Sequence, residues 1–410
     1  MAVFWLLTWL IGGLLTFFLG VFVWVFIQHL LTIEIPSTMK HPVKLWILHL
    51  IFQYSITLGT ILEKLRICSM PTILQLSQDL IIIKKKDPNV LVTDTHFGTV
   101  PVRLFRPKEV SSKLRRGIIF YHGGGAVCGS LDFYHGLGNV LAHETDSVVL
   151  LVGYRKLPDH HHPAIYLDCL NASIHFLKNL QTYGVDPSRV VISGESIGGL
   201  SVATVTQALV SQAMLPQIRA QVLITPGLQG INFQLPSCQQ KQNVPLLTRD
   251  LMITFICRYL NIDLSWKNAI VIGACVPLDT WKKYSKWISS DNIPKRFKSK
   301  NFHPEFLGPF SKTAYLETKT LLDANFSPLL ADDKIIAQLP DTFLVSCEHD
   351  VLRDDALLYK KRLEDQGVPV SWYHAEDGFH GCISLFDKQP FSFPCSMNVL
   401  NAVIHYIKGV

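Results

Sequence analysis

The segment RVVISGESIGGL, residues 189–200, contains the pattern that decides the fold. A β-branched run at residues 190–193 predicts a buried strand, and residues 200–210 have the pattern of a helix. The intervening G-x-S-x-G pentapeptide is typical of a strained strand-to-helix turn that holds a serine hydroxyl at the top of a sheet. Glycines are expected on either side of Ser196 because the turn brings neighbouring backbone too close for side chains. Ser196 is therefore the candidate nucleophile.

A second glycine-rich segment follows an upstream strand-like run. Residues 117–121 predict a strand, and His122 with three successive glycines comes directly after it. Loops of this type aim backbone N–H groups at the oxyanion of a tetrahedral intermediate. A flexible glycine turn is the alternative, but the strand before the loop and Ser196 downstream favour an oxyanion hole. Its predicted donors are the amides of Gly123, Gly124 and Ile197.

Two further strand-like runs lead to the residues that a serine nucleophile needs. Residues 342–347 lead to Asp350, and residues 370–374 lead to His380. The chain order serine, acid, histidine is that of α/β-hydrolases. In this arrangement His380 takes and returns the proton, while Asp350 fixes the imidazole tautomer and stabilises the imidazolium.

Other charged and imidazole side chains compete for these roles. Glu348 is a possible acid, whereas Asp354 and Asp355 are better explained by a place at a helix N-terminus. His374 alternates within a strand and is expected to be structural. The three consecutive histidines at residues 160–162 cannot all face one ion, so we expect a polar loop there. No metal or other cofactor is predicted.

Strands alternate with helical patterns along most of the chain. The predicted strands are residues 91–97, 100–105, 117–121, 147–154, 189–193, 220–225, 342–347 and 370–374. The first two are expected to form an antiparallel edge pair, and the rest a doubly wound, mostly parallel sheet. The candidate site residues all fall beyond strand carboxyl ends, where such sheets bind ligands. The predicted class is therefore α/β, an α/β-hydrolase fold with a helical cap.

The N-terminal segment has the composition of a membrane span. Residues 1–33 contain no Asp, Glu, Lys or Arg, and residues 3–27 are almost wholly apolar. About 20 such residues cross a bilayer. A cleaved signal peptide is the alternative, but no basic segment precedes the run, the run is too long, and no A-x-A-like site follows it. We therefore predict an uncleaved transmembrane signal-anchor at residues 1–33.

The rest of the chain divides into two predicted regions. Residues 34–90 are expected to form a helical cap and linker, and residues 91–410 the α/β domain, with a cap insertion at about 227–325. Residues 45–62 are also uncharged, but their polar side chains favour a lid or interfacial helix. As a second span they would place the domain in the cytosol.

Orientation, charge and cysteine content give weaker signals. Lys40 and Lys44 after the anchor favour a cytosolic domain, whereas the N-glycosylation sequons at Asn171 and Asn325 are useful only in the lumen.

The net charge of +6, from 38 basic and 32 acidic residues, is too small to indicate nucleic acid as a partner. The nine cysteines show no paired spacing. One possible disulfide, permitted in a lumenal compartment, joins Cys128 and Cys347.

These motifs resemble the arylacetamide deacetylase-like family, in the hormone-sensitive-lipase-like branch of α/β-hydrolases that includes the GDXG lipolytic enzymes. The "like-4" type is the most similar. The resemblance runs from about residue 90 to the C-terminus. It is carried by YHGGG (121–125), YRKLPD (154–159), GESIGG (194–199), SPLLADD (327–333), DVLRDD (350–355) and DGFHG (377–381).

The resemblance implies a single-pass type II membrane protein with carboxylic-ester or amide hydrolase activity and a domain in the endoplasmic reticulum lumen. The implied triad is Ser196, Asp350 and His380, with residues 122–124 in the oxyanion hole. The chain departs from arylacetamide deacetylase at Glu195 and Ile197, where that protein has Asp and Ala.

From these observations we expect a membrane-anchored serine hydrolase. Its substrates would be lipophilic esters or amides with small to medium acyl groups, cleaved through an acyl-enzyme. Apart from this small-molecule substrate, the only predicted partner is the membrane. The alternative is a protein that kept the fold but binds a ligand with little or no turnover. Ile197, beside an oxyanion donor, is the residue that favours this alternative.

Overall fold

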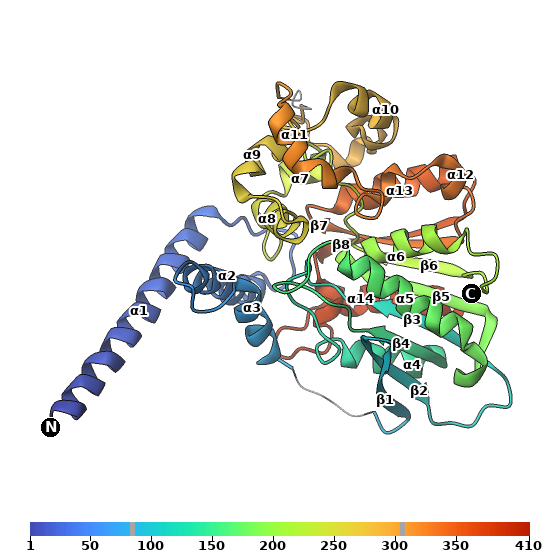
Figure 1. The fold of residues 1–410 in the computed structure, drawn as a ribbon, viewed down its shortest axis with the longest axis horizontal. Coiled ribbons are helices and arrows are strands. Elements are labelled where there is room, and N and C mark those ends of the chain that lie inside the picture. Colours follow the sequence, from blue (N-terminus) through green and yellow to red (C-terminus); the bar gives the residue numbers. More distant parts are fainter. Residues whose placement is uncertain (83–86, 304–307) are drawn as a thin grey trace.

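Eight strands form one mixed sheet in the residues described by the computed structural model, 1–82, 87–303 and 308–410 (Figure 1). The strands are β1 Val90–Phe97, β2 Val100–Pro107, β3 Arg115–Tyr121, β4 Ser147–Val152, β5 Val185–Glu195, β6 Ala220–Ile224, β7 Asp341–His349 and β8 Val370–Phe379. Their order across the sheet is β1-β2-β4-β3-β5-β6-β7-β8. β2 pairs antiparallel with β1 and β4, and the remaining neighbours are parallel. The predicted fold class and the predicted edge pair are confirmed.

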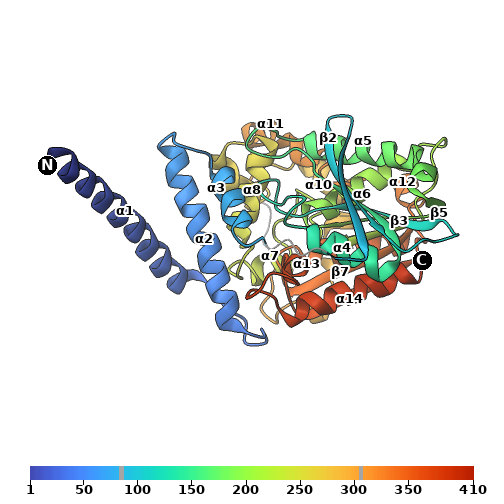
Figure 2. The ribbon, with the colours of Figure 1, turned by 90° about the horizontal axis from the view of Figure 1, so that it is seen from below.

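Helices cover both faces of the sheet, which is why its central strands β3, β4 and β6 are buried along nearly their whole length rather than at alternate residues. One face packs against α5 (Ala164–Lys178), α6 (Ile197–Leu209) and α13 (Arg353–Asp365). The other packs against α4 (His135–Thr145) and α14 (Pro394–Lys408). Figure 2 shows α5 and α14 on opposite sides of the sheet. Every residue of β4, Ser-Val-Val-Leu-Leu-Val, is buried.

The connection between β6 and β7 is long and mostly helical. It contains α7 Pro236–Gln240, α8 Arg249–Leu260, α9 Lys267–Val271, α10 Leu278–Ile288, α11 Lys312–Thr318 and α12 Asp333–Ile336. Figure 1 shows α7 to α11 grouped on one side of the sheet. Most of this connection lies within the predicted cap insertion at 227–325, of which residues 304–307 are outside the described part.

The N-terminal region consists of α1 (Ala2–Thr32), α2 (Pro42–Lys64) and α3 (Met70–Asp79). α1 projects from the rest of the molecule, whereas α2 and α3 lie against the α/β domain (Figures 1 and 2). Both α1 and α2 are long and apolar enough to cross a membrane. They differ in burial, because 11% of the apolar window of α1 is buried inside the protein, compared with 39% for α2. Residues 83–86 of the predicted cap and linker at 34–90 lie outside the described part.

Candidate active site

Ser196 stands at the sharp turn between β5 and α6. Its φ is 57° and its ψ is −119°, a strained backbone conformation for a residue with a side chain. A Cβ on Gly194 would lie 2.4 Å from the Gly198 carbonyl oxygen, and a Cβ on Gly198 would lie 2.2 Å from the Tyr121 carbonyl oxygen. Only glycine therefore fits at these two positions, and the turn presents the Ser196 hydroxyl beyond the carboxyl end of β5.

Three side chains from separate strand ends meet at this hydroxyl. The Ser196 Oγ lies 2.8 Å from the His380 Nε2, and the His380 Nδ1 lies 2.9 Å from the Asp350 Oδ2. His380 follows β8 directly, and Asp350 follows β7. The second Asp350 oxygen accepts a hydrogen bond of 2.8 Å from the Leu352 amide. The Asp350 side chain is fully buried, whereas that of His380 is 11% exposed, so the carboxylate is held still beneath a more accessible imidazole.

The charges around His380 favour its protonated form. Burial lowers the pKa of His380, but the neighbouring Asp350 carboxylate and Glu195 raise it more, so the net shift is upward. Because the Asp350 carboxylate accepts a hydrogen bond from Nδ1, the neutral ring carries its proton on Nδ1. The unprotonated Nε2 then faces Ser196 as the proton acceptor.

The loop of residues 122–125 is held by two buried tyrosines that sequence analysis did not identify. The Tyr154 hydroxyl donates to the His122 carbonyl oxygen at 2.6 Å. The Gly123 amide donates to the Tyr134 hydroxyl oxygen at 3.1 Å. The His122 ring is fully buried, and burial together with Lys156 lowers its pKa to about 3, so it is neutral. These contacts give His122 and Gly123 a role in shaping the loop.

The engagement of the Gly123 amide differs from the sequence prediction that it is an oxyanion donor. Within the described residues, the amides of Gly124, Gly125 and Ile197 donate to no protein acceptor. Gly124 has a φ of +122°, which turns the loop around Ser196. We therefore assign the candidate oxyanion donors to Gly124, Gly125 and Ile197. Gly125 was overlooked because a run of three glycines does not reveal which amides are occupied.

Glu195, the residue before Ser196, is linked to the glycine loop through Tyr134. The Tyr134 hydroxyl donates to the Glu195 Oε2 at 2.5 Å, so Tyr134 bridges Glu195 and the Gly123 amide. Burial raises the pKa of Glu195 to about 7. No sequence motif marks Tyr134, which precedes α4 and reaches the site only through the fold.

Tyr134→Phe is expected to lower kcat about tenfold while leaving KM nearly unchanged. The substitution removes one hydrogen bond to the glycine loop and one to a buried carboxyl, each worth about 1 kcal/mol. The Tyr134 ring, which lines the larger cavity, stays in place. Steady-state kinetics of ester hydrolysis measure the effect, with Tyr315→Phe, remote from Ser196, as the matched control. An unchanged kcat in Tyr134→Phe would contradict the assigned role of the bridge.

Two cavities meet at Ser196. A cavity of about 80 Å³ extends past Ile197 and Leu200 toward Asp355. A larger cavity of about 220 Å³ extends past His380 and is walled by α2 and α3. Four residues line both cavities: Gly125, Ser196, Leu247 and Phe255. The N-terminal helices and the β6–β7 connection, the two segments predicted as a cap, thus both contribute to the walls of the site.

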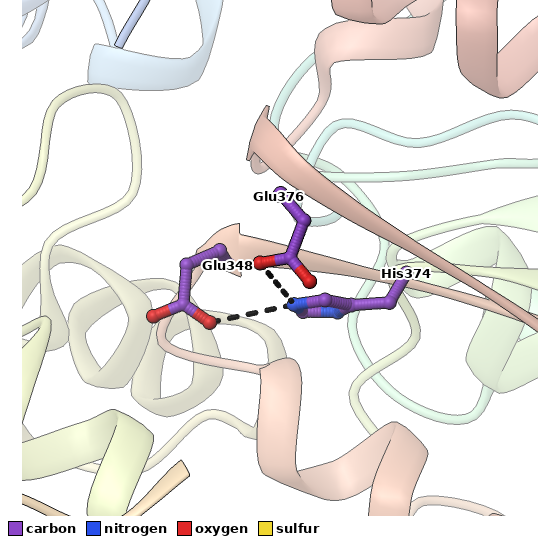
Figure 3. Close-up of side chains that lie close together, drawn as sticks. All are labelled: Glu348, His374 and Glu376. Atoms are coloured by element: carbon purple, nitrogen blue, oxygen red, sulfur yellow. Dashed lines mark ion pairs between the residues drawn. The ribbon is translucent and has the colours of Figure 1, made fainter. Parts of the chain in front are cut away.

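One group of side chains has the composition of a metal site. Glu348, His374 and Glu376 bring potential ligand atoms within 4.8 Å of one another (Figure 3). However, the Glu348 carboxylate already pairs with Lys241 at 2.9 Å and with Arg353 at 3.2 Å. Burial raises the pKa of Glu348, but the hydrogen bond with His374 and these two cations lower it further than burial raises it. The arrangement therefore fits an ion-pair network better than a cation site.

The remaining alternative side chains are occupied elsewhere. Asp354 accepts from the Ser237 amide at 2.6 Å, and Asp355 accepts from the Leu228 amide at 2.7 Å. The His374 Nδ1 hydrogen-bonds with the Ser346 hydroxyl at 2.9 Å. In the histidine run, His161 contacts the Arg258 carbonyl oxygen and His162 contacts Asp323, so their rings bind different partners.

The possible disulfide between Cys128 and Cys347 is not formed, and that interpretation was wrong. The Cys128 thiol donates to the Gly124 carbonyl oxygen at 3.4 Å. The Cys347 sulfur instead lies 3.9 Å from the Cys382 sulfur. Both cysteines lie near the same edge of the sheet, but Cys128 follows the glycine loop whereas Cys347 is buried in the core of the other face.

Residues 118–286 and 290–384 match a protein family described as the alpha/beta hydrolase fold. The chain is 63% identical over 410 residues to arylacetamide deacetylase-like 4 of Homo sapiens, covering 100% of both chains. It is 35% identical over 369 residues to arylacetamide deacetylase of Rattus norvegicus, covering 88% of this chain and 92% of the relative. It is 33% identical over 390 residues to neutral cholesterol ester hydrolase 1 of Bos taurus, covering 92% and 94%.

A solved structure shows the same fold at lower sequence identity. A thermostable esterase from Pseudomonas putida superimposes with a TM-score of 0.62 and 20% identity, covering 83% of this chain and 89% of that chain. The family match covers both the turn that carries Ser196 and the position of His380 directly after β8. The chain therefore belongs to the arylacetamide deacetylase-like family of α/β-hydrolases.

Proposed function

We propose that the protein is a membrane-anchored serine hydrolase that cleaves carboxylic esters of lipophilic compounds. The observation that carries this proposal is the continuous chain of contacts from Asp350 through His380 to the Ser196 hydroxyl, beside the unoccupied amides of Gly124 and Gly125. Relatives named as an arylacetamide deacetylase and a neutral cholesterol ester hydrolase support the same class of reaction.

In this mechanism the Ser196 Oγ attacks the ester carbonyl while the His380 Nε2 takes its proton. The amides of Gly124, Gly125 and Ile197 stabilise the oxyanion of the tetrahedral intermediate. His380 then returns the proton to the leaving alcohol, and the acyl group remains on Ser196. Water, activated by the same imidazole, attacks the acyl-enzyme and releases the acid.

The two cavities receive different parts of the substrate. The leaving oxygen must lie next to His380, because this residue protonates it, so the alcohol belongs in the larger cavity beside α2. The acyl group then occupies the smaller cavity, which begins at Ile197. The substrate class that fits is a short-chain acyl ester of a bulky apolar alcohol.

Two measurements test this proposal. A fluorophosphonate probe is expected to label the full-length protein in detergent or liposomes and not the Ser196→Ala variant. In a series of esters of one alcohol, from acetyl to octanoyl, kcat/KM is expected to fall beyond the short chains that the smaller cavity holds. Labelling that persists in Ser196→Ala would overturn the assignment of the nucleophile. A preference for octanoyl esters would overturn the assignment of the cavities.

Activity is expected to fall as the pH drops through the pKa of His380. The imidazole must be neutral to accept the Ser196 proton, and its pKa lies above the ordinary 6.5, so kcat/KM rises with pH across that raised value. Glu195→Gln removes a nearby carboxylate and is expected to shift this limb to lower pH. The profile of kcat/KM against pH measures the shift, with Asp365→Asn on the surface as the control. No difference between the two variants would contradict the coupling.

We further propose that α1 is a signal-anchor and that the domain lies in the endoplasmic reticulum lumen, as in a type II membrane protein. The apolar α1 and the sequons at Asn171 and Asn325 support this orientation. Asn171 lies on the exposed side of α5, accessible to a glycan.

Endoglycosidase treatment is expected to increase the gel mobility of the wild type. Asn171→Gln should remove part of that shift, and Asn171→Gln with Asn325→Gln should remove all of it. A wild type whose mobility never changes would take away the sequence support for a lumenal domain.

A further inference from the structure

We infer that the outer face of α2 lies against the lipid bilayer, so that the larger cavity exchanges substrate directly with the membrane. The residues that define this face, here called the α2 stripe, are Val43, Ile47 and Ile51. The inference rests on the proposed function, because it supplies a route for the lipophilic alcohol part of the ester substrate.

α2 has three faces with different surroundings. One face packs on the α/β domain and is buried at residues such as Leu45 and Ile56. A second face packs on α1, through Leu50 among others. The third face is the α2 stripe, whose members are spaced four residues apart and thus share one side of the helix. Their exposed fractions are 69%, 41% and 46%.

The exposed apolar surface continues beyond α2. Exposed apolar side chains of α3 and of the turn before it are Leu65, Ile67, Leu76 and Leu80. α2 and α3 pack against each other, and exposed apolar side chains gathered on neighbouring helices are a feature of membrane or protein contacts. Lys64 and Arg66, exposed at the end of α2, suit an anionic headgroup layer at its edge.

Continuity with α1 identifies the bilayer as the occupant of this surface. The 31 residues of α1 extend about 46 Å, whereas about 20 residues cross a hydrocarbon core of about 30 Å. About ten residues at one end are thus left over. The α1 side chains that meet α2, including Val21 and Val25, belong to the half of α1 nearest the domain. Figure 2 shows α2 beside the end of α1 that leads into the domain. We therefore expect α2 at the boundary of the membrane that α1 crosses.

The larger cavity reaches the surface at this face. Ile51 is both a member of the α2 stripe and part of the cavity wall. Ser77 and Gln78 of α3 line the cavity between the exposed Leu76 and Leu80. His380 and Ser196 line the inner end of the same cavity. A lipid-dissolved ester can therefore approach the hydroxyl without crossing water.

Photocrosslinking of the full-length protein in phosphatidylcholine and phosphatidylserine liposomes tests the contact. Benzoylphenylalanine at position 47 is expected to crosslink to phospholipid. Position 110 is 95% exposed and shortly precedes the amino end of β3, whereas Ser196 lies beyond the carboxyl end of the neighbouring parallel strand β5. The same group at position 110 is expected not to crosslink to phospholipid. Crosslinking of position 47 to a second copy of the chain, or to nothing, would overturn the inference. This readout does not require turnover.

Kinetics test the route. The double variant Val43→Glu and Ile47→Glu changes two residues that line neither of the cavities at Ser196. It is expected to lower kcat/KM for a long-chain ester dissolved in the liposomes about tenfold. Hydrolysis of water-soluble p-nitrophenyl acetate should stay within about twofold of wild type. Val110→Glu is the matched control for an added surface charge. An equal loss on both substrates, or no loss on either, would overturn the inference. Failure of the wild type to hydrolyse the soluble ester would instead overturn the proposed function.

Discussion

Ser196→Ala is expected to lower kcat for ester hydrolysis by about 10⁶-fold, the largest effect of any single substitution in this chain. The hydroxyl oxygen is the attacking atom, and without it only the oxyanion donors and substrate binding remain. His380→Ala should have a similar effect. Asp350→Asn should cost about 10⁴-fold because it disturbs the imidazole tautomer while leaving the nucleophile in place.

Combining these substitutions is expected to add little to the loss in Ser196→Ala, because the three side chains act as one unit. The measurement is turnover of a soluble ester, with the melting temperature recorded for each variant. Ser196 makes one side-chain hydrogen bond, to His380, so the fold should survive its removal. Ser211→Ala, just beyond α6, is the control. Ser196→Ala with turnover near that of the control would refute the mechanism.

Gly124→Ala is expected to lower kcat by about 10²–10³-fold, the typical cost of losing an oxyanion donor. A Cβ at this position would lie 2.3 Å from the Cys128 carbonyl oxygen, and the φ of +122° is one that alanine rarely adopts. The loop must therefore move, and the amides of Gly124 and Gly125 move with it.

Gly98→Ala is the matched control for this change. Gly98 also has a positive φ, +62°, but nothing lies within 4 Å of the added Cβ, and the residue is in the turn between β1 and β2. It should lose a little stability and no activity. Stopped-flow or steady-state kinetics with both variants separate backbone strain from displaced donors. Equal kcat in the two variants would show that the glycine loop does not bind the oxyanion.

Three features that the sequence did not predict arise from contacts between distant segments: the bridge made by Tyr134, the occupied Gly123 amide and the partner of Cys347. Tyr134 is 61 residues from Glu195 and joins it to the glycine loop. Nothing in the local pattern around Tyr134 marks this contact. The occupied Gly123 amide follows from the same tyrosine. The partner of Cys347 was similarly hidden, because Cys382 approaches it only across β7 and β8.

The sequence by itself determined the fold class, the eight strands and the segments that carry Ser196, Asp350 and His380. These are local properties, since apolar runs of five to eight residues bounded by glycine and polar turns specify strands, and a strained serine turn has its own glycine pattern. Only the tertiary structure decided which amides of the glycine loop are free, how two cavities divide the site at Ser196, and that α2 both walls one of them and exposes an apolar stripe. Those features depend on distances between residues far apart in the chain, which packing sets and no local pattern encodes.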